Sequence, residues 1–122
     1  MKTVAVIGAS SNRRKFGNKA LRAFANQGFK VIAINPNEPE VEGHQTYASV
    51  LDVPEPIDLA TIYVPASVGV RVMEDLAQKG IREVWLNPGA DAPEVVRKAQ
   101  TLGLKPVLHC SILAIGESPG RY

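Results

Sequence analysis

The stretch that decides the fold is TVAVIGASSNRRKFG, residues 3 to 17. Residues 3 to 7 form a continuous apolar run rich in β-branched side chains, which is typical of a parallel strand covered on both faces. Gly8 ends the run and a polar loop follows it. Apolar residues at helical spacing come next, at positions 20, 21, 24 and 25, and end before Gly28. This stretch and the residues after it therefore predict a strand, a loop and a helix in succession.

The same unit recurs along the chain. Further short apolar runs predict strands at 29–34, 59–64, 83–86 and 105–108, and two segments between them have helical spacing and end at Gly80 and Gly103. Strands that alternate with helices indicate an α/β fold with a parallel sheet and right-handed crossovers. We therefore predict one Rossmann-like, doubly wound domain over residues 1–122, with about five parallel strands and helices on both faces. Residues 38–56 are expected to be irregular, with at most a short helix near residues 47–51.

Composition narrows the class of protein. A chain of 122 residues with 45% apolar side chains can bury a substantial core. No apolar run is long enough to cross a bilayer, and the N-terminus lacks the features of a signal peptide. Cys110 is the single cysteine, which excludes an internal disulfide and predicts a cytoplasmic location. The two histidines and one cysteine form no metal-binding pattern, so no metal site is expected.

Charge is distributed unevenly. Residues 1–37 contain seven basic side chains and no acid, whereas the remainder contains seven basic side chains and all twelve acids. Such a division creates a local positive field that attracts anions, although a solvated basic surface would have the same composition. Aromatic residues are not interleaved with the basic ones, so nucleic acid is not the expected partner.

In an open parallel sheet, ligands bind beyond the carboxyl ends of the strands. The loop at residues 8–17 is not a dinucleotide-binding or Walker A motif, but it combines small residues, hydroxyls and basic side chains before a helix N-terminus. It therefore predicts a phosphate site, with a simple strand-to-helix turn as the alternative. The candidate binding residues of this loop are Gly8, Ala9, Ser10, Arg14, Lys15 and Gly17.

Two other loops distinguish between ligands. Domains that bind NAD carry an acidic residue near the end of the second strand, where it bonds the ribose. Asn35, Pro36 and Asn37 stand there instead, which favours a ligand with a phosphorylated ribose, NADP or coenzyme A, over NAD. Val64-Pro65-Ala66 then offers a narrow apolar edge suited to a pantetheine arm. A plain Asn-Pro turn and a helix cap at Ser67 are the structural alternatives.

No catalytic constellation is evident. His109 and Cys110 are adjacent, and neighbours on an extended segment point to opposite faces, so they are poorly placed as a base and a nucleophile. Trp85 is expected to be a core aromatic residue. We assign no catalytic residue, and the sequence leaves open whether the protein is an enzyme, with non-catalytic binding favoured.

These loops together resemble the small CoA-binding domain proteins, which are similar to the N-terminal domain of the succinyl-CoA synthetase α subunit. The resemblance implies that residues 8–10, 15 and 17 hold the CoA phosphates, that Asn35 and Pro36 lie near the adenosine, and that Val64, Pro65 and Ala66 line the pantetheine channel. It also implies a small cytoplasmic protein that binds CoA or an acyl-CoA without synthetase activity, since the ligase domain has no counterpart in these residues. The alternative is an NADP-binding oxidoreductase or a nucleotide-binding regulatory subunit. The matching stretches are VAVIGASSNRRKFGN (4–18), VIAINPN (31–37), IDLATIYVPA (57–66), GIREVWLNPGA (80–90) and GLKPVLHCSI (103–112).

Overall fold

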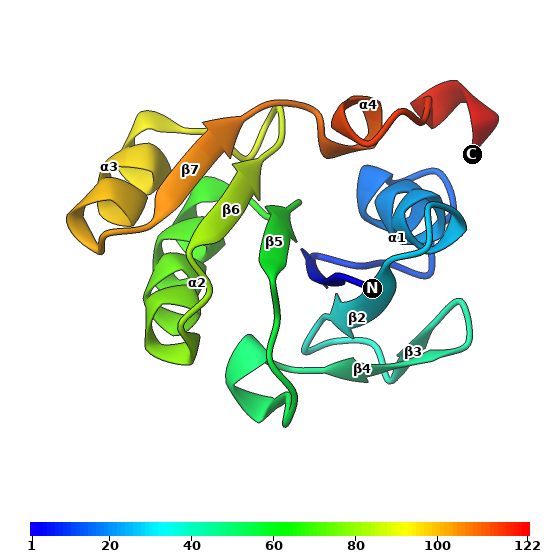
Figure 1. The fold of residues 1–122 in the computed structure, drawn as a ribbon, viewed down its shortest axis with the longest axis horizontal. Coiled ribbons are helices and arrows are strands. Elements are labelled where there is room, and N and C mark those ends of the chain that lie inside the picture. The colour runs from blue at the N-terminus through cyan, green and yellow to red at the C-terminus, as the bar shows by residue number, and fades with distance from the viewer.

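The computed structural model describes residues 1–122 and contains one seven-stranded sheet (Figure 1). The strand order is β3-β4-β2-β1-β5-β6-β7, and all neighbouring strands are parallel except the β3–β4 pair. The strands are β1 (Thr3–Ile7), β2 (Lys30–Ile34), β3 (Glu40–Val41), β4 (His44–Tyr47), β5 (Leu59–Ile62), β6 (Glu83–Leu86) and β7 (Lys105–Leu108).

Helices cover both faces of the sheet, as predicted. The α-helices are α1 (Phe16–Asn26), α2 (Ala66–Lys79), α3 (Pro93–Thr101) and α4 (Ser111–Ala114), and two 3₁₀ turns span Val50–Asp52 and Pro119–Arg121. Met73 of α2 and Val95 of α3 share one core with alternate strand residues, whereas Phe24 of α1 and Ile112 of α4 share the other. Figure 1 shows α2 and α3 on one side of the sheet and α1 on the opposite side. The Rossmann-like α/β fold is therefore confirmed.

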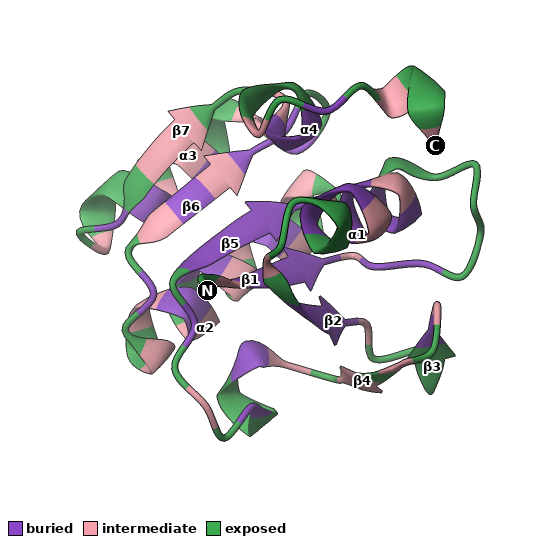
Figure 2. Ribbon diagram, turned by 45° about the vertical axis from the view of Figure 1, so that its right-hand side comes forward, coloured by how far each residue is buried: buried purple, intermediate pink, exposed green.

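The central strands explain why the sequence pattern was continuous rather than alternating. Four of the five residues of β1, four of β2 and all four of β5 are buried, because each strand presents side chains to both cores. Figure 2 shows these three strands buried over almost their whole length, while β4 and the edge strand β7 are more exposed. Strands covered on both faces have no solvent side, so nearly all of their central positions are apolar, and Thr61 of β5 is the buried polar exception.

The predicted strand count was too low, because β3 and β4 lie in the segment that was expected to be irregular. Glu42 and Gly43 join them in a two-residue turn with φ angles of 48° and 81°. Such a turn is typical of a tight β-hairpin, but it usually contains Asn-Gly or Asp-Gly, which this segment lacks. The short helix expected near residues 47–51 is the 3₁₀ turn Val50–Asp52.

The face of helix α2 that packs into the core is not the face on which Val68 and Val72 lie. Val68, Val72 and Leu76 recur at helical spacing, but the buried residues of the helix are Gly69, Met73 and Leu76. The small Gly69 lets α2 approach Val95 of α3. Because the helix turns this face to the core, Val68 and Val72 lie beside the carboxyl edge of the sheet.

The sheet reverses its direction of winding between β1 and β5. Beside β1 on one side lie β2, β4 and β3 in spatial order, and after β4 the chain returns to add β5, β6 and β7 on the other side. Connections leave β1 and β5 in opposite directions at such a point, which opens a crevice at their carboxyl ends. Separately, no helix in the structure has the length and apolar composition that a membrane crossing requires.

Candidate functional site

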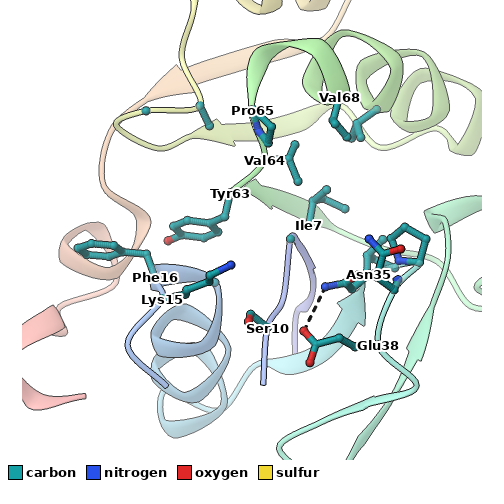
Figure 3. Close-up of a pocket in the computed structure, with 18 of the residues that line it drawn as sticks. Ile7, Ser10, Lys15, Phe16, Asn35, Glu38, Tyr63, Val64, Pro65 and Val68 are labelled. Atoms are coloured by element: carbon teal, nitrogen blue, oxygen red, sulfur yellow. Dashed lines mark hydrogen bonds between the residues drawn. The ribbon is translucent and has the colours of Figure 1, made fainter. Parts of the chain in front are cut away.

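A cleft of about 1190 Å³ lies at this reversal point, at the carboxyl edge of the sheet (Figure 3). Four loops and the first turns of α2 surround it, as expected for an open α/β sheet. Its principal lining residues are Gly8, Ser10, Lys15, Phe16 and Gly17 after β1, Asn35, Pro36, Asn37 and Glu38 after β2, Tyr63, Val64 and Pro65 after β5, Val68, Arg71, Val72 and Asp75 of α2, and Pro88, Gly89 and Ala90 after β6.

Most of the predicted binding residues converge on this cleft, but three do not. Gly8, Ser10, Lys15, Gly17, Asn35, Pro36, Val64 and Pro65 line it. Ala9 has no exposed surface and packs in the core under α1. Arg14 is exposed outside the cleft, and Ala66 begins α2 outside the cleft lining. A ligand-binding role for all eleven residues stays a prediction.

The two glycines of the first loop are required by contacts within the chain. Gly8 has a φ of 90°, and a Cβ atom on it would lie 2.5 Å from the carbonyl oxygen of Tyr63. A Cβ atom on Gly17 would lie 2.2 Å from the carbonyl oxygen of Gly8. The loop is therefore wedged between the end of β5 and the start of α1, which fixes its backbone at the mouth of the cleft.

Lys15 places a free positive charge at the N-terminus of α1. It is the N-cap residue, no side chain caps the helix, and the first turn contains no acid. No carboxylate lies within ion-pair distance of its ammonium group. Figure 3 shows the Lys15 side chain extending beside Tyr63 and Ser10. A helix N-terminus and an unpaired ammonium group both favour an anion at this end of the cleft.

The other basic side chains of the loop are directed elsewhere. Arg13 bonds Glu42 through its Nε (3.1 Å) and Nη2 (2.8 Å) atoms. Asn18 is buried and also donates to Glu42 (3.0 Å) and to the carbonyl oxygen of Ser10 (2.8 Å). The β3–β4 hairpin thus anchors the first loop, and only part of the positive charge in that loop faces the cleft.

The Arg13–Glu42 contact predicts a contribution to stability that depends on pH. The hydrogen bond from Arg13, followed by that from Asn18, lowers the pKa of Glu42 from 4.5 to about 2. A lowered pKa in the folded state stabilises the protein above pH 4.5, and this contribution disappears as the pH falls from 4.5 to 2. Arg13 is largely exposed, so we expect a contribution of about 1 kcal/mol.

Urea unfolding of the wild type and of Glu42→Gln at pH 7 and pH 3 measures this contribution. The variant should lose stability at pH 7 and should show a smaller further loss at pH 3 than the wild type. Glu40→Gln, which changes an exposed acid of the same hairpin that has no side-chain partner, is the control. Equal acid sensitivity of the wild type and Glu42→Gln would contradict the assignment.

Glu38 is one of the charged cleft residues that the sequence interpretation missed, together with Arg71 and Asp75 of α2. Its carboxylate accepts hydrogen bonds from the Ser11 amide (3.1 and 3.2 Å), from the Ser11 hydroxyl and from Asn35 Nδ2 (3.3 Å). The bonds from the Ser11 side chain and then its amide lower the pKa of Glu38. Figure 3 shows the Asn35–Glu38 contact on the side of the cleft that β2 provides.

The expectation that no carboxylate stands at the end of β2 holds for residues 35–37 but not for the cleft. The Asn37 amide donates to Asn35 Oδ1 (2.8 Å), so the chain turns after Pro36 and brings Glu38 back toward the first loop. The turn places the acid beyond the positions that immediately follow the strand, so those positions alone do not indicate it. The missing acid therefore cannot be used to favour a phosphorylated ribose.

The opposite side of the cleft is largely apolar. Val64 and Pro65 follow β5, and Val68 and Val72 continue the surface along α2. In Figure 3 Val64, Pro65 and Val68 lie across the cleft from Ser10 and Glu38. Beyond the valines, Arg71 is exposed and makes no ion pair. The cleft therefore has one polar, charged side and one largely apolar side, on which Arg71 and Asp75 are the charged residues.

His109 and Cys110 lie outside the cleft lining. The His109 Nδ1 atom is 3.0 Å from the Cys110 carbonyl oxygen, and its ring lies edge-on to half-buried Trp85 with centroids 6.4 Å apart. No hydrogen bond joins the His109 ring to the Cys110 thiol.

The Tyr63 hydroxyl is buried without a hydrogen-bond partner, and burial raises the pKa of Tyr63 to about 12.

Comparisons with known proteins agree with this fold. The family model described as a CoA binding domain matches residues 2–116. ADP-forming acetate–CoA ligase I of Archaeoglobus fulgidus is 35% identical over 116 residues, which cover 87% of this chain and 17% of the ligase. The corresponding ligase of Methanocaldococcus jannaschii is 41% identical over 81 residues, 66% of this chain and 12% of that ligase. The chain thus spans less than a fifth of the length of these two relatives.

Solved structures match over most of the chain. A conserved hypothetical protein from Pyrococcus furiosus has a TM-score of 0.84 and 30% identity, over 93% of this chain and 99% of that one. The dinucleotide-forming acetyl-coenzyme A synthetase 1 of Ca. Korarchaeum cryptofilum, solved with phosphate and ADP, has a TM-score of 0.76 and 30% identity. That match covers 88% of this chain and 25% of the synthetase. The fold therefore occurs both in a chain of similar length and as part of longer ones.

Proposed function

The chain belongs to the CoA-binding domain family, and from this premise we propose that it binds coenzyme A or an acyl-CoA in the cleft at the carboxyl edge of its sheet, without catalysing a reaction itself. The observation that carries the proposal is the position of Lys15. Its unpaired ammonium group lies at the N-terminus of α1, directly at the reversal point where ligands of open α/β sheets bind.

The two sides of the cleft match the two chemical parts of coenzyme A. The diphosphate is an anion, and Lys15, the Ser10 hydroxyl and the helix N-terminus supply a positive end for it. The pantetheine arm offers methyl groups and amides, which suit the apolar surface of Val64, Pro65, Val68 and Val72. The cleft volume of about 1190 Å³ is sufficient for an extended ligand of this size.

The surroundings of the cleft support the non-catalytic role in this proposal. No side-chain nucleophile that lines it is hydrogen-bonded to a histidine base, and His109 and Cys110 lie outside it. The ligase relatives are several times longer than this chain, so the machinery for ligase chemistry would have to be supplied by other polypeptide. We propose that residues 1–122 act as one CoA-binding unit, in the cytoplasm, alone or on behalf of a protein partner.

An NADP-binding oxidoreductase is the weaker candidate. The family model that matches the chain describes a CoA binding domain, and coenzyme A carries a phosphorylated ribose as NADP does, so the Glu38 carboxylate favours neither ligand over the other. Titration with NADPH, followed by its fluorescence, separates the two candidates. Binding of NADPH tighter than that of coenzyme A would favour the oxidoreductase.

Lys15→Ala tests the proposed phosphate site. Removing one charge-assisted contact to a phosphate should weaken binding of coenzyme A about tenfold. The side chain is exposed, so the free energy of unfolding should change by no more than about 0.5 kcal/mol. Isothermal titration calorimetry gives the affinity, and the melting temperature with and without coenzyme A gives an independent reading, because a ligand of the folded state raises it.

Lys105→Ala is the matched control, since Lys105 is an exposed lysine on β7 outside the cleft and should not affect affinity. If millimolar coenzyme A neither raises the melting temperature of the wild type nor gives heat on titration, the proposed function is wrong. If coenzyme A binds wild type and Lys15→Ala equally, Lys15 does not contact the phosphates.

A further inference from the structure

Within the proposed function, on which this inference rests, we propose that Asp75 of α2 is a specificity-determining residue that recognises the base of the ligand. It selects adenine, whose 6-amino group donates hydrogen bonds, over a purine with a 6-oxo group. The relevant feature is a half-buried carboxylate that lines the cleft and has no cationic side chain within 4.0 Å.

One face of α2 forms a wall of the cleft and carries Asp75 at its end. Val68, Arg71, Val72 and Asp75 are the residues of α2 that line the cleft, and they are spaced so that their side chains share one side of the helix. The apolar part of this wall ends at Val72. The Asp75 carboxylate therefore lies directly beyond the apolar surface, where a ligand that follows the wall presents a polar edge.

The position of Asp75 indicates which part of the ligand it meets. Ser49 comes shortly after β4, and its hydroxyl donates to Asp75 Oδ2 (3.4 Å). Strand β4 pairs with β2, so Asp75 lies on the β2 side of the reversal point. In open α/β sheets the diphosphate lies over the loop after the first strand, and the adenosine lies toward the end of the second strand. Asp75 is thus at the end of the cleft where the base is expected.

The surroundings of Asp75 suit a flat heteroaromatic ring with a donor on its edge. Ile34, Ala48 and Val72 line this end of the cleft and offer apolar contacts for the faces of the ring. The Asp75 Oδ1 atom accepts no hydrogen bond within the protein, and an ionised carboxylate can only accept. The 6-amino group of adenine is a donor, whereas a 6-oxo group is an acceptor. A 6-oxo purine would therefore place two acceptors opposite each other.

Arg71 makes the same end of the cleft compatible with the phosphorylated ribose of coenzyme A. Arg71 is exposed, lines the cleft and makes no ion pair, although Asp75 is only one helical turn away. An unpaired guanidinium group can bind a phosphate while the carboxylate binds the base. The two unpaired charges of α2 thus match the two polar groups of a phosphorylated adenosine, its phosphate and its amino group.

A purely structural role of Asp75 makes a different prediction. Ser49 caps the 3₁₀ turn Val50–Asp52 by accepting from the Leu51 amide (3.1 Å), so the Ser49–Asp75 contact could simply hold this turn against α2. In that case Asp75→Asn and Ser49→Ala would both weaken the binding of adenine and 6-oxo ligands to the same degree. If Asp75 recognises the base, only Asp75→Asn changes the ratio of the two affinities.

The test measures dissociation constants of coenzyme A and of its 6-oxo (hypoxanthine) analogue by isothermal titration calorimetry, for the full chain and for Asp75→Asn. We expect the wild type to bind coenzyme A about tenfold more tightly, equivalent to about 1.4 kcal/mol, because the analogue loses a hydrogen bond to a charged acceptor. In Asp75→Asn this preference should disappear, since an amide can accept from an amino group or donate to an oxo group. Glu74→Gln removes the neighbouring exposed acid of α2, which lies outside the cleft, and should keep the wild-type preference.

Each other outcome overturns a distinct statement. Equal or tighter binding of the 6-oxo analogue by the wild type, an unchanged preference in Asp75→Asn, or the same change of preference in Ser49→Ala overturns the role of Asp75 and leaves the proposed function standing. Binding of neither ligand to the wild type overturns the proposed function as well. The wild-type comparison of the two ligands needs no variant, so the inference stays testable even if Asp75→Asn fails to fold.

Discussion

Gly17→Ala is expected to lower the free energy of unfolding by about 3 kcal/mol, although alanine is the better helix former by about 1 kcal/mol. Gly17 is the second residue of α1, and the added methyl carbon would lie 2.2 Å from the Gly8 carbonyl oxygen and 3.5 Å from the Ala9 Cα atom. These neighbours are backbone atoms, so no side chain can rotate away. Either α1 or the first loop must move.

Urea unfolding at pH 7 measures the loss, and thermal unfolding should show a melting temperature about 10 °C lower. The displacement also reaches Gly8 and Lys15, so coenzyme A should bind Gly17→Ala more weakly than it binds the wild type. Gly120→Ala is the matched control, because a Cβ atom there meets nothing closer than 3.7 Å and φ is not in the left-handed range. Similar losses for the two glycine variants would show that the close backbone approach is not the cause.

Asn87→Ala is expected to cost about 3 kcal/mol of stability, for a different reason. The Asn87 side chain is buried and donates to Thr61 Oγ1 (2.8 Å) and the Ile62 carbonyl oxygen (3.0 Å), while its own carbonyl accepts from the Ser111 amide (2.8 Å). Alanine would leave three buried polar groups without these partners. It would also release the start of α4 from the end of β6.

Asn37→Ala is the control, since the Asn37 side chain is exposed and makes no hydrogen bond. Urea unfolding compares the two variants, and amide hydrogen exchange at Ser111 reports whether α4 is released. If Asn87→Ala loses under about 0.5 kcal/mol, as Asn37→Ala should, then the network of Asn87 is not a principal anchor of this edge. We expect faster exchange at Ser111 in Asn87→Ala only.

The strands on both sides of the reversal point could be predicted because their signal is local. β1, β2 and β5 are buried on both faces, so the sequence is almost continuously apolar there, and runs this short are typical of strands. Gly28, Gly80 and Gly103 follow α1, α2 and α3 at positive φ angles, which explains why glycine indicated where these helices end. By contrast, β3 and β4 are short and partly exposed, and their pairing depends on the hairpin turn and on β2.

For the candidate site, the sequence predicted which loops form it but not which of their side chains enter it. The loops after β1, β2 and β5 were identified because chain order alone places strand ends at one edge of a parallel sheet. Which side chains of those loops enter the cleft could not be read in the same way. Arg14 and Lys15 are adjacent and equally basic, yet only Lys15 lines the cleft.

The sequence by itself thus determined the Rossmann-like order of elements, the CoA-binding family and the loop after β1 as the centre of the site. It could do so because apolar runs and glycines determine the structure of the residues next to them in the chain. The tertiary structure alone decided that Glu38 shares that site, that Val68 and Val72 face the cleft, and that Asn87 anchors α4. The partners of Glu38 and Asn87 stand as far as 27 and 26 residues away in the chain. A hydrogen bond over such a separation exists only after the sheet has brought the two loops together, so no local pattern records it.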